Sequence, residues 1–514
     1  MKYSTLTVAF LGFCVLGYFP VTHADRLTPN LTNETKMQHE QSWLNEVRTN
    51  DKNIRQLQDN ASAQKDFNRS VIKDIPNQKV FDQNLQCLST SKLLNEQKLT
   101  LLNAIERAVC RYPETRSAWI QTQIQAAQLK ITKSNFYPQI NTSLGYDWGR
   151  DNYQVDDRPD LSYDTDTRRY SLAVRVNWLL YDFGTRYYQV EEAKKLLAMS
   201  LAQNNVVLQN LIMKTISAYY QIVQTELKLN NIQQLVNYAE KNYEISNARY
   251  QSGVGIKSDV LQMTANLAKA KSEQIQFTGE LKIAKGQLAT LMGDSAYQNF
   301  NIDNQLKIPK ELNLKDIELL IKEAEQLHPR FKAAQYDTLA AQAKITSIQR
   351  SKYPSLSFNT NYDQSKQFGE SPFGNEIQRL QAGVQLNFPL FDGFNRKNQI
   401  VVAQENLKLK QLEEERLKLE INAEIWKSYN QLNAIHENIK SLALLNDSAS
   451  QAYEVVQGRY KSGVGNLLEV LNAQNLLNEA QVNYSSQLTE FLVVRYQLLS
   501  NMGNLNIWAE SESQ

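Results

Sequence analysis

An internal duplication constrains the fold of this chain more than any other feature. The heptapeptide RYQSGVG at residues 249–255 returns as RYKSGVG at residues 459–465, a separation of 210 residues. DVL at 259–261 matches EVL at 469–471 with the same separation. Self-similarity over so long a period indicates two copies of one structural unit. The sequence therefore predicts two internal structural repeats, residues 98–293 and 315–503, joined by a linker at 294–314.

Each copy contains one very long helical segment. Residues 187–250 and 397–460 lack proline, and Gly458 is their only glycine. At 1.5 Å per residue each helix would be about 96 Å long, which no compact core can hold. Glycine in RYxSGVG supplies the left-handed backbone that ends one helix and starts the next. The chain is predicted to turn back there and to run as residues 256–292 and 466–502.

Shorter helices are predicted over 114–136 and 330–352, and an alternating pattern follows each of them. Apolar and polar residues alternate through the strand pairs 139–180 and 355–390, with polar stretches at 148–169 and 364–379 between the strands. Each strand has about the nine to eleven residues that cross a bilayer at a tilt. A soluble hairpin lying on a core is the alternative. If the strands do cross a membrane, four of them cannot close without unpaired edges, so the barrel must be shared between chains.

The N-terminus predicts export. Lys2 precedes an apolar run from Leu6 to Phe19, and small residues follow, so residues 1–24 are interpreted as a signal peptide. A retained N-terminal anchor is the alternative. Residues 25–97 form a polar extension and 504–514 a polar tail. The mature chain keeps two cysteines, Cys87 and Cys110, for which an oxidising compartment predicts a disulfide, with two buried thiols as the alternative.

Composition points away from several functions. The 56 basic and 54 acidic residues give a net charge of +2, which provides no bulk field for nucleic acid. Only four histidines occur. Because there is no HExxH, P-loop, GxSxG or clustered Cys/His pattern, we expect no enzyme, cofactor or metal site. His328, before Pro329, is interpreted as an ordinary surface histidine at a helix boundary.

Several motifs together resemble the TolC family of outer-membrane channel-tunnels over residues 98–503. They are LTLLNAIERAVCRYPETRSAW at 99–119, the two Tyr-Pro pairs before the strands, YDFGTR at 181–186, LFDGFNR at 390–396 and the twin RYxSGVG turns. The resemblance implies a mixed α and β membrane protein. It implies a homotrimer whose twelve-stranded outer-membrane β-barrel, four strands per chain, continues into a periplasmic α-helical barrel of a Gram-negative bacterium.

The same resemblance implies a periplasmic aperture at the two turns. Asp259 and Tyr460 would belong to its closing network, and Glu469 would place one carboxylate per chain in a ring. A solvated helix charge is the alternative for Glu469. Asn472 replaces a second acidic residue of the family pattern, and Gly465 replaces an arginine. Ten residues are candidates for contact with a periplasmic adaptor: Arg249, Tyr250, Gly253, Val254, Gly255, Arg459, Tyr460, Gly463, Val464 and Gly465.

By resemblance, the function is that of an outer-membrane component of a tripartite export system. The chain would form a passive duct, embedded in outer-membrane lipid, and an adaptor with an inner-membrane pump or ABC transporter would open it. The CRYPETRSAW signature and the cysteine pair resemble members that serve type I protein secretion, whereas the fold serves drug efflux equally well. An exported structural coiled-coil or adhesin protein of the cell envelope is the alternative.

Overall fold

The computed structural model describes residues 98–303, 312, 316–368, 376–503 and 505, all of which belong to the unit Lys79–Gln514. The predicted signal peptide, the extension at 25–97 and Cys87 lie outside the described residues. So do parts of the predicted linker and all of the predicted tail except Leu505. The predictions for these segments stay predictions.

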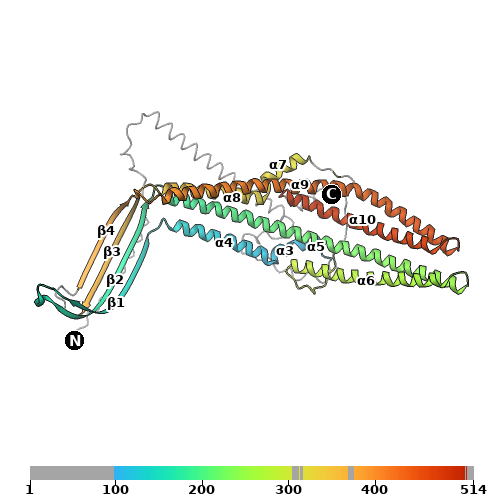
Figure 1. Cartoon of the computed structure of the whole chain (residues 1–514), viewed down its shortest axis with the longest axis horizontal. Helices are drawn as coiled ribbons and strands as arrows, with labels where there is room; N and C mark the ends of the chain where they lie inside the picture. The colour runs from blue at the N-terminus through green and yellow to red at the C-terminus, as the bar shows by residue number, and fades with distance from the viewer. Residues whose placement is uncertain (1–97, 304–311, 313–315, 369–375, 504, 506–514) are drawn as a thin grey trace, which may run out of the picture. The chain divides into compact units, whose positions relative to one another are not determined.

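The two predicted long helices are confirmed. They are α5 (Thr185–Gln251) and α9 (Asn395–Lys461), each of 67 residues. After a turn, each is followed by a returning helix of 35 residues, α6 (Lys257–Leu291) or α10 (Leu467–Asn501). In Figure 1 each returning helix runs back along its long partner, and α10 also packs against α5. Packing along the whole length is what a long helix with a narrow apolar stripe requires.

Shorter helices accompany the other halves of α5 and α9. Helix α4 (Pro113–Ser134) packs on α5, and α8 (Pro329–Arg350) packs against both long helices. Two further helices, α3 (Leu101–Arg111) and α7 (Ile317–Leu327), were not predicted as separate elements. They end just before α4 and α8 because Tyr112 and His328, which precede proline, have extended backbones.

Four antiparallel strands form one sheet in the order β1-β2-β3-β4. They are β1 (Gln139–Tyr153), β2 (Tyr163–Tyr181), β3 (Ser355–Phe368) and β4 (Glu376–Asn387), and Figure 1 shows them side by side. All four exceed the predicted nine to eleven residues. The ladder between β1 and β2 continues through most of the polar stretch at 148–169, as far as the pair Tyr153 and Tyr163. An Arg150–Asp164 pair, with 2.9 Å from Nε to Oδ1, ties the two strands together there.

One set of apolar side chains on the sheet is uncovered. Leu144 is 82 % exposed, and Ile140, Leu380, Val384 and Leu386 are exposed as well. The described part of the chain therefore offers no core that covers this set. Exposed apolar strand residues suit contact with lipid rather than the soluble hairpin considered above. No described helix has the length and apolar character needed to cross a bilayer.

Aspartate–arginine pairs fix the turns from strand to long helix. Arg186 is buried, lies 3.0 Å from Asp182 and donates a hydrogen bond of 2.8 Å to the carbonyl of Asn135. In the second turn Arg396 lies 3.2 Å from Asp392 and donates to the carbonyl of Ser351. Each arginine thus ties its long helix to the end of the preceding helix. YDFGTR and LFDGFNR therefore set the junction between sheet and helices.

The largest apolar core lies at the middle of α5 and α9, where α3 and α7 pack. On α5 the core side chains, Ile216, Tyr219, Ile222 and Val223 among them, project toward one side. The Tyr219 hydroxyl lies within hydrogen-bonding distance of the carbonyls of Leu99 and Asp303 and so anchors the segments beside α3. A polar cavity adjoins this core, and Met213 on α5 belongs to the core and also lines the cavity.

Candidate functional site

The two helical-hairpin turns, residues 249–259 and 459–469 (the tips), have the same backbone. In Figure 1 both lie at the ends of the hairpins away from the sheet. Gly253 and Gly463 have φ values of +79° and +84°, which favour glycine. The amides of Val254 and Val464 each donate 3.0 Å bonds to the carbonyls of Arg249 and Arg459. The predicted role of RYxSGVG as a hairpin turn is confirmed.

Gly465 has a steric role within its turn. A Cβ atom at this position would lie 3.0 Å from the backbone nitrogen of Tyr460, and Gly255 shows the same close approach. The backbone would have to shift to admit any side chain there. The glycine at this position, where the family pattern has an arginine, thus fits a tight approach of the turn backbone.

Arg249 and Tyr460 join the two tips. The Arg249 guanidinium donates a hydrogen bond to the carbonyl of Tyr460 and lies 4.6 Å from the centre of its ring. Tyr460 is only 1 % exposed, and its hydroxyl has no partner within the described residues. Tyr460 therefore contacts the first tip through its ring and its backbone. The sequence predicted Tyr460 in this region, but its contact with Arg249 was not foreseen.

Glu469 lies in the first turn of α10, next to the capping residue Asn466. Its backbone N–H donates to Asn466 Oδ1 at 2.9 Å, and its own Oε1 accepts from Asn466 Nδ2 at 3.0 Å. Its second oxygen lies 3.7 Å from Arg459 Nη1. Asp259 is half-buried in the corresponding first turn of α6, and Asn472 is exposed one turn beyond Glu469. The Glu469 carboxylate is therefore held in place before any second copy approaches.

A buried polar network, which sequence reasoning missed, connects the hairpins above the tips. Asn242 on α5 donates to the Tyr453 hydroxyl at 3.1 Å and to Gln474 Oε1 at 3.0 Å, and it accepts from Gln457 Nε2 at 2.9 Å. Asn266 on α6 also donates to Gln474. Burial raises the pKa of Tyr453 to about 12. We call these five residues the tip network: Asn242, Asn266, Tyr453, Gln457 and Gln474.

Apolar side chains at the tips are exposed. Val464 is 74 % exposed, and Val254, Ile256 and Leu468 are similarly uncovered, while Tyr250 is about half exposed. Arg459 is also largely exposed. A surface of exposed valine and isoleucine next to arginine and tyrosine has the composition of a contact region for another protein.

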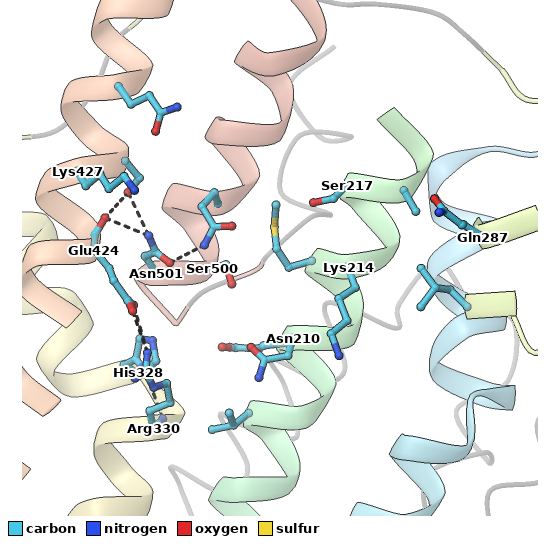
Figure 2. A pocket seen from close by; sticks show the side chains of 18 of the residues that line it. Asn210, Lys214, Ser217, Gln287, His328, Arg330, Glu424, Lys427, Ser500 and Asn501 are labelled. Atoms are coloured by element: carbon cyan, nitrogen blue, oxygen red, sulfur yellow. Dashed lines mark hydrogen bonds and ion pairs between the residues drawn. The ribbon is translucent and has the colours of Figure 1, made fainter. Parts of the chain in front are cut away.

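A polar cavity of about 1060 Å³ lies at the middle of the long helices. Figure 2 shows Asn210 and Lys214 on α5 at one wall, with Glu424 and Lys427 on α9 across from them. Arg330, at the start of α8, pairs with Glu424 at 3.2 Å and also with Glu420. We call this space, lined from α5, α6, α8, α9 and α10, the mid-helix cavity.

His328 borders this cavity and corrects a prediction. It is 4 % exposed, not an ordinary surface residue. Its Nδ1 accepts a 3.1 Å bond from the backbone N–H of Arg330 and so caps α8, while Gly503 packs against it. Burial, with a smaller contribution from Arg330, lowers the pKa of His328 to about 4. The cap needs a neutral imidazole, which this environment maintains.

The described residues test the disulfide prediction only in part. Cys110, near the end of α3, is disulfide-bonded. Cys87 lies outside the described residues, so the pairing of the two stays a prediction. Within the described ranges, no group of three or more histidine, cysteine, aspartate and glutamate side chains is arranged to hold a metal ion.

The structure combines a four-stranded sheet that exposes apolar side chains with two long helical hairpins whose tips touch. This combination defines a class of envelope protein. Residues 104–294 and 320–504 match the family described as outer membrane efflux protein. The chain belongs to this family, which is one of outer-membrane channel proteins rather than enzymes.

Relatives and solved structures agree with this assignment. Protein CyaE of Bordetella pertussis is 25 % identical over 393 residues, which cover 76 % of this chain and 81 % of that protein. The outer-membrane channel OprN superposes with a TM-score of 0.69 at 18 % identity, covering 79 % of this chain and 90 % of that one. The outer membrane protein VceC of Vibrio cholerae gives 0.67 at 18 % identity, covering 79 % and 96 %. The fold is therefore that of outer-membrane channels.

Proposed function

We propose that this protein is the outer-membrane duct of a tripartite export system and that it acts as a homotrimer. Three copies of the four-stranded sheet would close a twelve-stranded barrel, and the helices would continue it through the periplasm. The main observation in support is that the sheet has two open edges, β1 and β4, and an exposed apolar face. In lipid such edges must be paired.

Exposed helix faces support the same closure. Helix α4 packs on α5 at one side of the helical layer, whereas α9 packs on α8 and α10 at the other. The faces of α4 and α9 that remain exposed each carry a stripe of large apolar residues at helical spacing, which needs a partner helix. Pairing α4 of one copy with α9 of the next would close a ring. These residues are Ile120, Ile124 and Ile131 on α4, and Val402, Leu409, Leu412, Leu419 and Trp426 on α9.

The tips form the regulated end of the proposed duct. The Arg249–Tyr460 contact and the tip network hold the two hairpins of one protomer together and so favour a narrow entrance. Three copies of Glu469, with Asp259 nearby, would add a ring of carboxylates that favours cations. The element lengths, 67 and 35 residues in both hairpins, support the predicted internal duplication on which this arrangement depends.

The partners would be a periplasmic adaptor at the exposed tip residues and an inner-membrane pump or ABC transporter that supplies energy. The curated relative CyaE and the signature at 110–119 favour type I protein secretion as the transport task, with efflux of small molecules as the second candidate. The described residues show no nucleotide-binding motif, so the duct itself is passive.

Single-channel recording of the detergent-purified protein in planar bilayers, beside Glu469→Ala, tests this proposal. We expect small cation-selective steps for the parent and altered conductance or selectivity for the variant. Equal behaviour of the two would leave the duct and remove Glu469 from its entrance. If correctly folded protein fails to conduct and washes off membranes without detergent, a structural coiled-coil protein of the envelope becomes the better description.

A further inference from the structure

The mid-helix cavity is a large polar space that the tip mechanism leaves without a role. Its lining contains three cationic side chains, Lys214, Arg330 and Lys427, but only one carboxylate, that of Glu424. His328 is neutral near pH 7 because its pKa is lowered to about 4. Glu114 and Glu420, just outside the lining, pair with Lys214 and Arg330, so Lys427 is the lining cation whose charge is left to attract anions.

The charged side chains that line the cavity differ in whether they already form an ion pair. Arg330 is held between Glu420 and Glu424, so this cluster is neutralised internally. Lys214 lies 3.5 Å from Glu114, and both side chains are about half exposed, which makes the pair weak. Lys427 makes no ion pair within the part of the chain that the structure describes. Two lysines on different walls of the cavity are thus available to a ligand.

Polar side chains without hydrogen-bond partners among the described residues lie near the two lysines. Asn210 and Ser217, on the same side of α5 as Lys214, and Gln287 on α6 all line the cavity and make no side-chain hydrogen bond to other described residues. Other amides at the cavity are occupied: Gln209 donates to the carbonyl of Gly503, and Asn501 donates to that of Glu424. The amides of Gln209 and Asn501 are therefore used in contacts within the protein, whereas Asn210, Ser217 and Gln287 are free to bind a ligand in the cavity.

We propose that the mid-helix cavity binds small organic oxyanions, with Lys427 and Lys214 as the charged groups and Asn210, Ser217 and Gln287 as hydrogen-bond donors. The volume of about 1060 Å³ exceeds the needs of a simple inorganic ion and accommodates a polycarboxylate. The inference rests on the proposed function in one respect. The channel test below requires that ions in the lumen of a duct formed by three copies can reach the cavity.

Isothermal titration of the detergent-purified full-length protein with citrate at low ionic strength tests the site directly. We expect saturable binding that is tighter than for inorganic phosphate. Lys427→Gln and Lys214→Gln should each weaken it about fivefold, the size of one partly screened charge contact. Lys440→Gln, an exposed lysine on α9 outside the cavity that pairs with Glu437, is the matched control and should bind like the parent. No citrate binding, equal binding by all variants, or a preference for phosphate overturns the site.

Channel recording separates this inference from the duct itself. If the duct conducts, citrate added from the tip side should reduce the current of the parent and of Lys440→Gln more than that of Lys427→Gln. Conduction by the parent without citrate binding would refute the anion site and leave the duct. Citrate binding by a protein that never conducts would refute the duct and leave the site.

Discussion

Arg249 and Tyr460 lie 211 positions apart in the sequence, yet the guanidinium of one rests 4.6 Å from the ring centre of the other and donates to its carbonyl oxygen. The contact joins the two tips of a single protomer. It combines a cation–π interaction with a charge-assisted hydrogen bond, together about 1–3 kcal/mol. Holding the hairpins together therefore depends strongly on one arginine.

Arg249→Ala should loosen the tips. We expect a larger single-channel conductance, because both interactions with Tyr460 are lost while the turn backbone is kept. Tyr460→Phe is the informative comparison, since the hydroxyl it removes has no partner among the described residues. This variant should conduct like the parent. A conductance increase in Tyr460→Phe equal to that in Arg249→Ala would show that the hydroxyl, not the ring, holds the tips.

The tip network should contribute to stability as well as to closure. Asn242→Ala removes three buried hydrogen bonds, those with Tyr453, Gln474 and Gln457, although each of these partners keeps a second one, and we expect a cost of about 1–3 kcal/mol. Thermal unfolding in detergent should show a lower midpoint for this variant. Asn237→Ala, an exposed residue on the same helix, is the control and should unfold like the parent. A double-mutant cycle with Gln457→Ala should give a coupling energy, and strict additivity would exclude direct cooperation between Asn242 and Gln457.

Charge and capping at Glu469 can be separated. Glu469→Gln removes the negative charge but keeps an oxygen that can accept from Asn466, whereas Asn466→Ala removes the cap and keeps the charge. We expect Glu469→Gln to lower cation selectivity, measured as a reversal potential in a KCl gradient. Asn466→Ala should leave selectivity near that of the parent and reduce stability by about 1 kcal/mol. The reverse pattern would assign Glu469 a purely structural role.

His328 predicts a loss of stability in acid. Its pKa is about 4 in the folded protein and near 6.5 when unfolded, so below pH 6.5 the unfolded state binds the proton first. Stability should therefore fall as the pH drops from about 6.5 to about 4, by about 3 kcal/mol, and this contribution levels off below pH 4. His328→Asn, which can still cap α8, should show a smaller decrease in unfolding midpoint between pH 7 and pH 4.5 than the parent. Equal decreases would mean that other groups dominate the acid response.

The sequence by itself determined the features that depend on local pattern and chain length. The spacing of the two RYxSGVG turns, the proline-free segments and the alternation in the strands predicted the long helices, the hairpins and the sheet. Helical preference and strand alternation depend on neighbouring residues, so they can be predicted without knowing what packs against the segment. The strand ends were misjudged, because pairing between β1 and β2 extends an otherwise polar stretch.

Only the tertiary structure decided which polar residues are buried and what they contact. Asn242 on α5 and Gln474 on α10 belong to helices whose sequences are mostly polar, yet the two side chains meet between the hairpins. The sequence predicted a surface position for His328, but Gly503 and α8 pack against it and bury it. The mid-helix cavity likewise exists because five helices converge on it. A side chain's partners come from segments some two hundred residues away, and no local pattern specifies which face of a polar helix will meet them.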